Sequence, residues 1–391
     1  MVRTLRAHCV RRDSLPANRS RYCQVRLRAR TVARIVFRHL HALASRIGEI
    51  CGLEWPGSFC PPGAVMIESR ARVAVLQGGP AAEAAVSRVS AAGVAEALRT
   101  RCAEVVCIEL DEGLVDALRA FAPDVVFPAL HGPPGEDGTV QGLLELLGYP
   151  YVGSGVRASA CAMDKLISKQ IFRAAGLPLA RDVVVRNEDE FTAAMARVLD
   201  TLGEQVVVKP ARQGSALGVT LVDDAQQLAQ ALELALGLDD VVLVEERVYG
   251  REITVGVLDV VDQAGVLTRI AHPVIEILTP SGTWYDFEHR YTPGQSDHRV
   301  PAEVAEDVGR ALQETAVNAH AWLGCRDLSR ADFVLAEDRF VLLEVNNLPG
   351  MTPTSLYPEG ARALGHEFED LTAMLVRNAL LRGADLRLAR C

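Results

Sequence analysis

Residues 330–350 read RADFVLAEDRFVLLEVNNLPG. Two short apolar segments, 333–335 and 340–345, flank the polar residues 337–339, a pattern typical of two strands joined by a tight turn. Because the residues on both sides of this turn are mainly Phe, Val and Leu, we expect the hairpin to be mostly buried. The stretch therefore predicts an antiparallel β-hairpin in the last third of the chain.

Three polar side chains on this hairpin are candidate metal ligands. Glu344 and Asn346 are two residues apart on one strand, so they project from the same face, and Asp332 opens the partner strand near the same end. Two carboxylates and an amide oxygen suit Mg²⁺ that keeps waters and phosphate oxygens in its other positions. The alternative is an ordinary strand with its polar face in water, but buried carboxylates need a cation. The sequence favours the metal site, with Arg330 on the same side available to stabilise a developing oxyanion.

Lysine is rare in this chain: only Lys165, Lys169 and Lys209 are lysines among 41 basic residues. Lys209 ends a Val-rich strand and precedes the loop 211–219, which contains Ser215 between two glycines. Backbone amides of such a loop can close over phosphates, although the residue order of a P-loop is missing. The strand–loop–strand pattern predicts a hairpin here.

From residue 72 onward, strands and helices alternate. We expect strands at 73–76, 104–110 and 124–129, and helices at 81–98 and 115–121. This alternation predicts an open parallel α/β sheet, in which ligands bind beyond the carboxyl ends of the strands. Gly78-Gly79 and His131-Gly132 follow two of these strands, so both are candidate site loops.

The remaining pattern predicts further elements and a domain division. We expect helices at 156–175, 226–236, 304–323 and 367–381, and strands at 241–245, 252–258 and 269–278. The later strands indicate a mostly antiparallel sheet. We divide the chain into an Arg-rich leader (1–68), an N-terminal α/β domain (69–160), a central subdomain (161–248) and a C-terminal subdomain (249–385).

Charge is distributed unevenly. Residues 1–65 contain 12 Arg and three acids, a charge of +9, so with a net charge of −9 the remainder carries −9 − 9 = −18. An acidic body argues against a nucleic-acid surface, and no apolar run is long enough to predict a transmembrane helix. We expect the leader to be disordered, with at most one short helix at 39–50, or untranslated, with a start at Met66. A targeting segment or a nucleic-acid arm is the alternative.

The chain has nine cysteines, none in a Cys-x-x-Cys pair and none in a His/Cys cluster with zinc spacing. A reducing cytoplasm is therefore the simplest location. A Ser/His/acid hydrolase is also disfavoured, because no Gly-x-Ser-x-Gly elbow surrounds Ser215.

Short motifs recur in a fixed order between about residues 72 and 377. They are LHGPPGEDG (130–138), YVGSG (151–155), MDK (163–165), KP (209–210) with GS (214–215), GTWYD (282–286), RAD (330–332), LEVNNLPGMT (343–352) and SL (355–356). In this order and spacing they resemble the D-alanine–D-alanine ligase family. The resemblance implies an ATP-grasp fold of the α/β (α+β) class, with nucleotide between the central and C-terminal subdomains.

The resemblance also implies a role for each matching residue. ATP phosphates would contact Lys165, Lys209 and Arg290 (where the family commonly has Lys), and adenine and ribose would contact Glu245, the backbone of Val248, and Glu252. Two Mg²⁺, for which Mn²⁺ could substitute, would be bound by Asp332, Glu344 and Asn346. The first D-alanine would be held by Glu83, networked with Ser215 and Tyr291. The tetrahedral intermediate would be stabilised by Arg330 and the Gly350 amide, and the second D-alanine would lie by His131, Ser355 and Leu356.

The activity implied by the resemblance is the ATP-dependent joining of two D-alanines through an acyl phosphate, for peptidoglycan precursor synthesis. The partners would be small molecules, with no nucleic acid or membrane, and the enzyme would be a cytoplasmic homodimer. One alternative is a related ligase that joins D-alanine or another amino acid to a different amino or hydroxy acid. A non-catalytic nucleotide-binding protein is the other, and the intact Asp332, Glu344 and Asn346 set argues against it.

Overall fold

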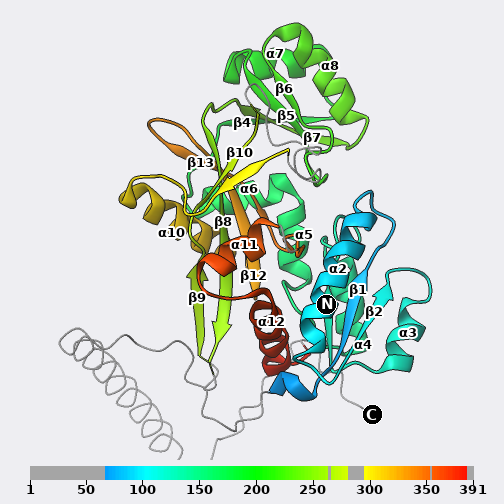
Figure 1. The fold of residues 1–391 in the computed structure, drawn as a ribbon. Helices are drawn as coiled ribbons and strands as arrows, with labels where there is room; N and C mark the ends of the chain where they lie inside the picture. The colour runs from blue at the N-terminus through cyan, green and yellow to red at the C-terminus, as the bar shows by residue number, and fades with distance from the viewer. Residues whose placement is uncertain (1–66, 263–265, 281–294, 353–354, 385–391) are drawn as a thin grey trace, which may run out of the picture. The chain divides into compact units, whose positions relative to one another are not determined.

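The structure is a computed structural model that describes residues 67–262, 266–280, 295–352 and 355–384. These ranges contain three β-sheets (Figure 1). Arg290, Tyr291 and the helix expected at 39–50 lie outside the described residues. No helix within the described ranges is long and apolar enough to cross a membrane.

The first sheet is parallel, as the alternating pattern predicted. Its strand order is β2-β1-β3. The strands are β1 (Arg72–Gln77), β2 (Glu104–Glu109) and β3 (Val125–Pro128), preceded by the 3-10 helix η1 (Ile67–Arg70) and interleaved with α2 (Ala84–Arg99), α3 (Leu114–Phe121) and α4 (Thr139–Leu147). The chain leaves β1 to form β2 on one side and then β3 on the other. This reversal is a topological switch point, where loops diverge and leave room for a ligand.

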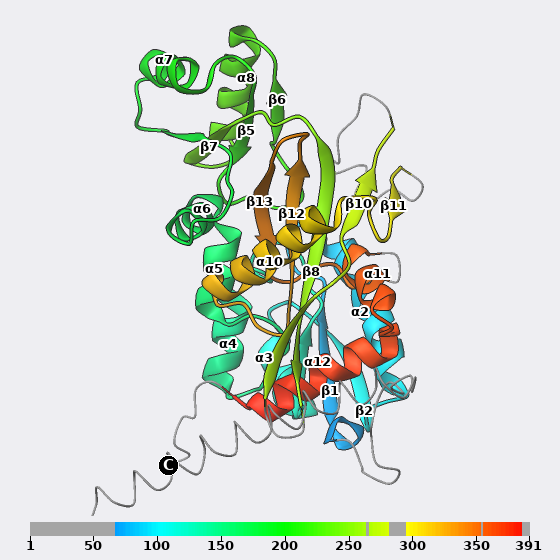
Figure 2. The ribbon, with the colours of Figure 1, turned by 90° about the vertical axis from the view of Figure 1, so that its left-hand side faces the viewer.

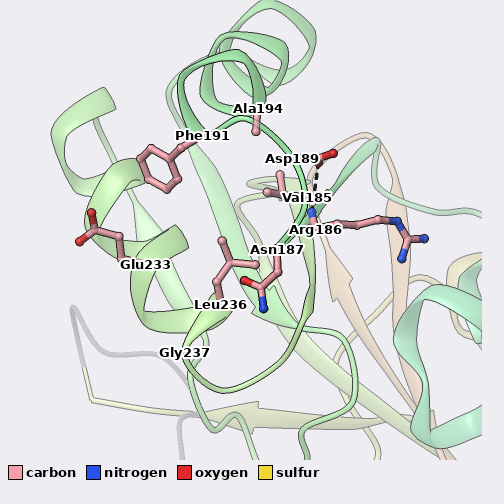
Figure 3. Close-up of a pocket in the computed structure, with 9 residues that line it drawn as sticks. All are labelled: Val185, Arg186, Asn187, Asp189, Phe191, Ala194, Glu233, Leu236 and Gly237. Carbon is pink, nitrogen blue, oxygen red and sulfur yellow. Dashed lines mark hydrogen bonds between the residues drawn. The ribbon is translucent and has the colours of Figure 1, made fainter.

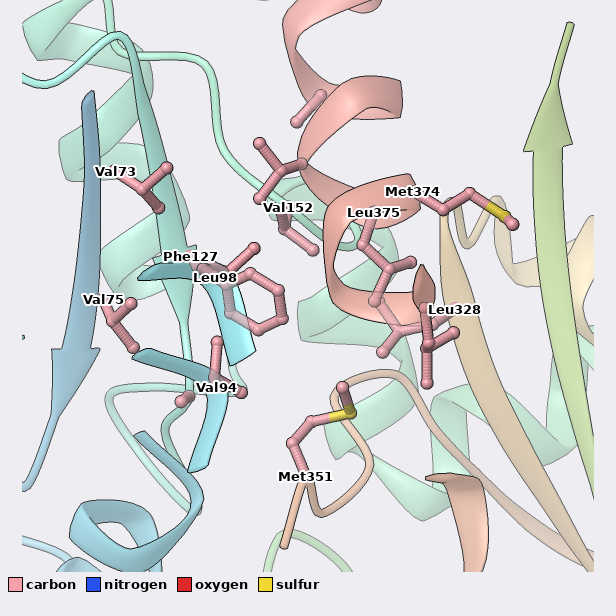
Figure 4. Close-up of a cluster of buried hydrophobic side chains, with 14 of the residues drawn as sticks. Val73, Val75, Val94, Leu98, Phe127, Val152, Leu328, Met351, Met374 and Leu375 are labelled. Atoms are coloured by element: carbon pink, nitrogen blue, oxygen red, sulfur yellow. The ribbon is translucent and has the colours of Figure 1, made fainter. Parts of the chain in front are cut away.

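The core on one face of this sheet is completed by a helix from the far end of the sequence. Figure 4 shows Val73, Val75 and Phe127 on one side and Met374 and Leu375 of α12 (Phe368–Arg382) on the other. All five are buried, and burial of a large apolar side chain contributes about 1.5–3 kcal/mol. The last turn of α12 adds an ion pair: both Arg382 Nη atoms lie 2.8 Å from the carboxylate oxygens of buried Asp327. Residues distant in sequence therefore share one core.

The second sheet is antiparallel, with the order β4-β7-β5-β6. Its strands are β4 (Asp182–Arg186), β5 (Val206–Pro210), β6 (Thr220–Val222) and β7 (Val241–Glu246), and helices α7 (Phe191–Leu202) and α8 (Ala225–Leu236) pack on it around an apolar core. The hairpin expected after Lys209 is confirmed as β5–β6. Strand β4 and helix α7 were not predicted from the sequence.

The prediction of one continuous helix at 156–175 is wrong. Two helices, α5 (Val156–Met163) and α6 (Lys165–Ala174), meet at Asp164, whose backbone is extended. The Asp164 side chain accepts a hydrogen bond from Ile167 N (3.0 Å), so it caps the start of α6. Ala158, Ala162 and Phe172 of these helices pack into the core of the third sheet. The break makes Lys165 the first residue of a new helix.

The third sheet is also antiparallel, with the order β11-β10-β8-β12-β13 and β9 paired to β8. Its strands are β8 (Arg251–Val261), β9 (Leu267–Ala271), β10 (Ile275–Leu278), β11 (Asp297–Arg299), β12 (Leu328–Leu335) and β13 (Phe340–Asn346). Helix α10 (Glu306–Leu323) packs against β8 and β12 (Figure 2), and α11 (Leu356–Ala363) packs against β8.

Two strand predictions in this sheet need correction. The strand expected at 269–278 is two strands, because Pro273 lacks the N–H that a continuous ladder needs. The strand of Asp332 begins at Leu328, so Asp332 lies inside the strand instead of opening it. Both of its neighbours, β8 and β13, pair along it at Asp332.

Candidate active site

The loops beyond β1 and β3 are joined by one buried serine. Ser87 of α2 accepts a hydrogen bond from Gly78 N (2.8 Å) and donates one to Ala129 O (2.7 Å). Gly78 has a positive φ of 72°, and a Cβ there would lie 1.7 Å from Glu109 Oε1. Glycine adopts this φ without strain, whereas a residue with a Cβ would be strained here and would displace the end of the Glu109 side chain. The two loops that the sequence singled out therefore start from a shared, rigid base.

The Glu83 carboxylate lies where two glycine loops converge. Glu83 immediately precedes α2 and is 9% exposed. A Cβ built on Gly132 would lie 3.1 Å from Glu83 Oε2, and one built on Gly214 would lie 3.9 Å from Glu83 Oε1. Next to Gly214, Ser215 adopts a positive φ of 49°, which is uncommon for a residue with a Cβ. The structure thus brings Glu83 close to the loop of His131 and to the loop of Ser215.

A second group gathers around Gly350. A Cβ on Gly350 would lie 2.9 Å from Ser355 Oγ and 4.0 Å from His131 Cε1. The His131 ring is held on both sides: Nε2 lies 3.3 Å from Ser90 Oγ, and Nδ1 lies 3.3 Å from Glu136 Oε1. Gly350 and Ser355 therefore meet His131, which comes from a distant part of the chain, and the missing Cβ of Gly350 keeps the space beside Ser355 Oγ free.

Leu356 differs from this group. Its side chain is buried in a small apolar cluster with Ile275 and Ile277. The structure therefore gives the Leu356 side chain a packing role.

The polar face of the β12–β13 hairpin carries the predicted metal set. Asp332 pairs in register with Glu344, and Arg330 pairs with Asn346. A bulge follows Asp332, so that the next residue, Phe333, pairs with Leu342. Residues of β13 before and after this point therefore alternate between the two faces of the sheet in opposite order. The bulge allows Ala331, Phe333, Leu342 and Val345 to enter one apolar core while the four polar side chains occupy the other face.

Both carboxylates of this face already contact donors. Arg330 donates from Nε and Nη2 to the two oxygens of Asp332, each at 2.8 Å, and Thr254 Oγ1 donates to Asp332 Oδ1 at 2.6 Å. Glu344 Oε2 lies 3.5 Å from Lys165 Nζ. Thr254 was not predicted from the sequence, because its position opposite Asp332 depends on a strand register that the sequence does not display.

The donor chemistry of this face suits a metal that binds together with phosphate. Among the described residues, no group of three or more His, Cys, Asp or Glu side chains forms a metal site by itself. Asp332, Glu344 and the amide of Asn346 supply hard oxygen donors, which Mg²⁺ accepts when phosphate oxygens and waters complete its coordination. Asn346 Oδ1 accepts from Leu348 N (2.9 Å), which fixes the orientation of the amide.

The lysines of α6 connect the second and third sheets. Lys165 Nζ donates to Gln213 O (2.6 Å) in the glycine loop, besides its contact with Glu344. One turn further along α6, Lys169 donates to Glu245 Oε1, and Lys209 of β5 donates to Glu245 Oε2 (2.5 Å). The sequence singled out Lys169 only by the rarity of lysine and gave it no role.

Glu245 is nearly inaccessible, with an exposed fraction of 2%. Burial alone raises the pKa of its carboxyl, but the ammonium groups of Lys209 and Lys169 outweigh burial, and the pKa lies below its ordinary value. The carboxylate is therefore an anion fixed by two cations. Two other predicted nucleotide contacts lie nearby in sequence: Val248 between β7 and β8, and Glu252 on β8 opposite Val334.

A separate cavity of about 400 Å³ lies beside β4, α7 and α8, and Figure 3 shows Phe191, Leu236 and Asn187 around it. Its lining residues, which also include Arg186, Asp189 and Glu233, contain none of the predicted site residues. This cavity is not part of the candidate active site.

The fold and the site define a class of protein. Two antiparallel sheets, one carrying Lys209 and Glu245 and the other carrying the acidic β12–β13 face, are connected through the lysines of α6. This is the arrangement of an ATP-grasp enzyme.

Comparisons with known proteins give the family. The family model for the D-ala D-ala ligase C-terminus matches residues 171–377, and the model for the N-terminus matches residues 115–154. D-Alanine–D-alanine ligases of Ruegeria pomeroyi and Halalkalibacterium halodurans are 46% and 42% identical to this chain, each over 79% of it, and over 96% and 99% of their own lengths. The crystal structure of the D-alanine–D-alanine ligase from Bacillus anthracis complexed with ATP has a TM-score of 0.69 at 30% identity, and covers 80% of this chain and 98% of that one. The chain belongs to the D-alanine–D-alanine ligase family.

Proposed function

We propose that this protein uses ATP to join two D-alanines into D-alanyl-D-alanine through an acyl-phosphate intermediate. The observation that carries the proposal is the Lys165 ammonium, which lies 3.5 Å from Glu344 and bonds to the glycine loop at Gln213. A cation between a glycine loop and the Glu344 carboxylate suits the transfer of a phosphoryl group from ATP. The joined product would serve peptidoglycan precursor synthesis.

The nucleotide end of the proposal assigns the charged residues. Lys165, Lys209 and Arg290 would contact the phosphates, and Glu245, the Val248 backbone and Glu252 would hold adenine and ribose. Asp332, Glu344 and Asn346 would hold Mg²⁺, two ions in all, with Mn²⁺ as a possible substitute. When bound, Mg²⁺ would offset the charge on the phosphate oxygens.

The amino-acid end of the proposal uses the two groups of convergent residues. Glu83, with Ser215 and Tyr291, would bind the ammonium of the first D-alanine, because a buried carboxylate favours a cation. His131, Ser355 and the Leu356 backbone would border the second D-alanine. Arg330 and the Gly350 N–H would donate to the oxyanion that forms when the second amine attacks the acyl phosphate.

A panel of substrates tests the proposal. ADP release is measured with purified protein, ATP and Mg²⁺ in the presence of D-alanine, D-serine, D-lactate or L-amino acids, each alone and each paired with D-alanine. We expect D-alanine alone to support turnover. Turnover that requires a second, different acid would instead indicate the related ligase that forms a mixed peptide or a depsipeptide. ATP binding without any turnover across the panel would refute a ligase.

Location and assembly complete the proposal. We propose a cytoplasmic homodimer, as the family resemblance implies. Light scattering coupled to size-exclusion chromatography gives the mass in solution, and a value near the 42.2 kDa of one chain would refute the dimer.

A further inference from the structure

A buried cluster of four charges lies where α6 meets the second sheet. Lys169 and Glu245 are 4% and 2% exposed, which is rare for ionisable side chains. Lys169 donates to Glu245 Oε1 and also lies 3.3 Å from Asp182 Oδ1. Lys209 contacts the other oxygen of Glu245. The proposed function uses Glu245 and Lys209 but gives no role to Lys169.

The secondary structure fixes this geometry. Asp182 of β4 and Val207 of β5 both pair in register with Glu245, so Glu245 stands in the middle of the sheet. Lys209, two residues beyond Val207 on the same face, reaches it diagonally. Lys165 and Lys169 are four residues apart on α6 and share one face of the helix. Helix α6 therefore carries both Lys165, which contacts Glu344, and Lys169, which contacts Glu245.

The two oxygens of Glu245 would keep different partners in the proposed reaction. Lys209 would leave Oε2 in order to contact the ATP phosphates, while Lys169 is held on the other side by Asp182. Lys169 would then be the remaining ammonium on a carboxylate that must accept a hydrogen bond from adenine. Without a cation, a buried carboxylate tends to take up a proton or move.

We propose that Lys169 is a positioning residue for the nucleobase: it holds the Glu245 carboxylate in place, as an anion, when Lys209 turns to the phosphates. This role rests on the proposed function, because it assumes that Glu245 contacts adenine. Lys169 itself would touch neither ATP nor amino acid.

Probes that separate the two ends of the nucleotide test this role. The dissociation constants of ADP and of tripolyphosphate are measured by calorimetry for the unaltered protein and for Lys169→Met. We expect ADP to bind about tenfold more weakly to the variant, since roughly one charge-assisted hydrogen bond is misplaced. Tripolyphosphate, which has no base, should bind with unchanged affinity. Equal weakening of both probes, or unchanged ADP binding, would overturn the proposal.

A pH profile distinguishes positioning from general destabilisation. The charged groups facing Glu245 are Lys169 on α6, Lys209 on β5 and Asp182 on β4, and Arg173 contacts Asp182 from the exposed side of α6. Since the two lysines hold the Glu245 pKa below its ordinary value against the effect of burial, removal of one moves that pKa upward. In Lys169→Met, ADP affinity should therefore begin to fall at a higher pH on acidification. A profile identical to that of the unaltered protein would count against the role.

Matched variants complete the test. Arg173→Met removes the other partner of Asp182 on the same helix and should leave both dissociation constants unchanged, and Lys169→Arg should recover most of the ADP affinity.

In a Glu245→Gln background, the Lys169→Met change should add little, because its effect passes through Glu245. This double variant removes one charge of each sign, so it remains informative if Lys169→Met alone does not fold. A clear further loss of ADP affinity relative to Glu245→Gln would refute the proposal. Failure of D-alanine turnover with this binding pattern intact would refute the ligase assignment alone.

Discussion

Replacement of Arg330 by lysine tests the oxyanion role while keeping the positive charge. Arg330 donates to both oxygens of Asp332 at 2.8 Å, from Nε and Nη2, in a buried site. A lysine ammonium is a single point donor and cannot reproduce this planar fork. Once anchored to Asp332, the lysine therefore has no N–H donor directed at the position where the oxyanion forms. Removal of one such donor costs about 2.7–4 kcal/mol, so we expect kcat to fall about 10²–10³-fold.

The assay is ADP release with D-alanine as the substrate. Because the lost contact belongs to the transition state, kcat and kcat/KM should fall together, with KM nearly unchanged. Arg339→Lys is the matched control: Arg339 lies in the turn of the same hairpin, is half exposed, and contacts Glu246 at 3.1 Å. It should keep activity within about twofold, as exposed ion pairs contribute little. A kcat of Arg330→Lys within fivefold of the control would refute the oxyanion role.

Three further outcomes are expected. Glu344→Gln should abolish ADP release at saturating ATP, because it removes a proposed metal carboxylate; substantial turnover at any Mg²⁺ concentration would contradict this. Met351→Ala should lower the free energy of unfolding by about 2–5 kcal/mol in urea titrations, since Met351 is 2% exposed in the core shared with α12; a loss below about 0.5 kcal/mol would contradict the packing argument. The hydrogen bond from Arg251 is the largest influence lowering the pKa of Glu276 below 4.5. This pair stabilises the fold fully above the unfolded-state pKa and loses that contribution as pH falls through the folded-state value. Urea midpoints should therefore drop more steeply on acidification in the unaltered protein than in Arg251→Met, and parallel curves would count against the pair.

The parallel sheet and the hairpins were predictable because their signals are local. Alternation of strand and helix from residue 72 predicted β1, β2 and β3, and the predicted ends of each strand lie within two residues of the observed ends. The polar turn at 337–339 located β12–β13 for the same reason. The break at Asp164 had a local signal too, an N-cap residue before a helix, but the Ala-rich residues before it favour helix and concealed the boundary.

Features that depend on distant partners were not predictable. The bulge after Asp332 appears only when β12 is aligned with β13, and it decides that Leu342 and Glu344 lie on opposite faces although they are two residues apart. Thr254 and Lys169 became relevant only when sheet register and helix packing brought them to Asp332 and Glu245. The motifs indicated the chemistry, but the contacts that support the site residues could be identified only from the three-dimensional structure.

The packing of α12 on the first sheet has a consequence for synthesis of the chain on the ribosome. Strands β1 to β3 leave the exit tunnel well before Leu371, Leu375 and Ala379, which cover part of their apolar face and are translated much later. We therefore expect the nascent N-terminal region to stay incompletely packed, and to rely on chaperones, until residues 368–382 have emerged. A ribosome that stalls before residue 368 would present that exposed face to proteases, so packing of the N-terminal sheet depends on translation through α12.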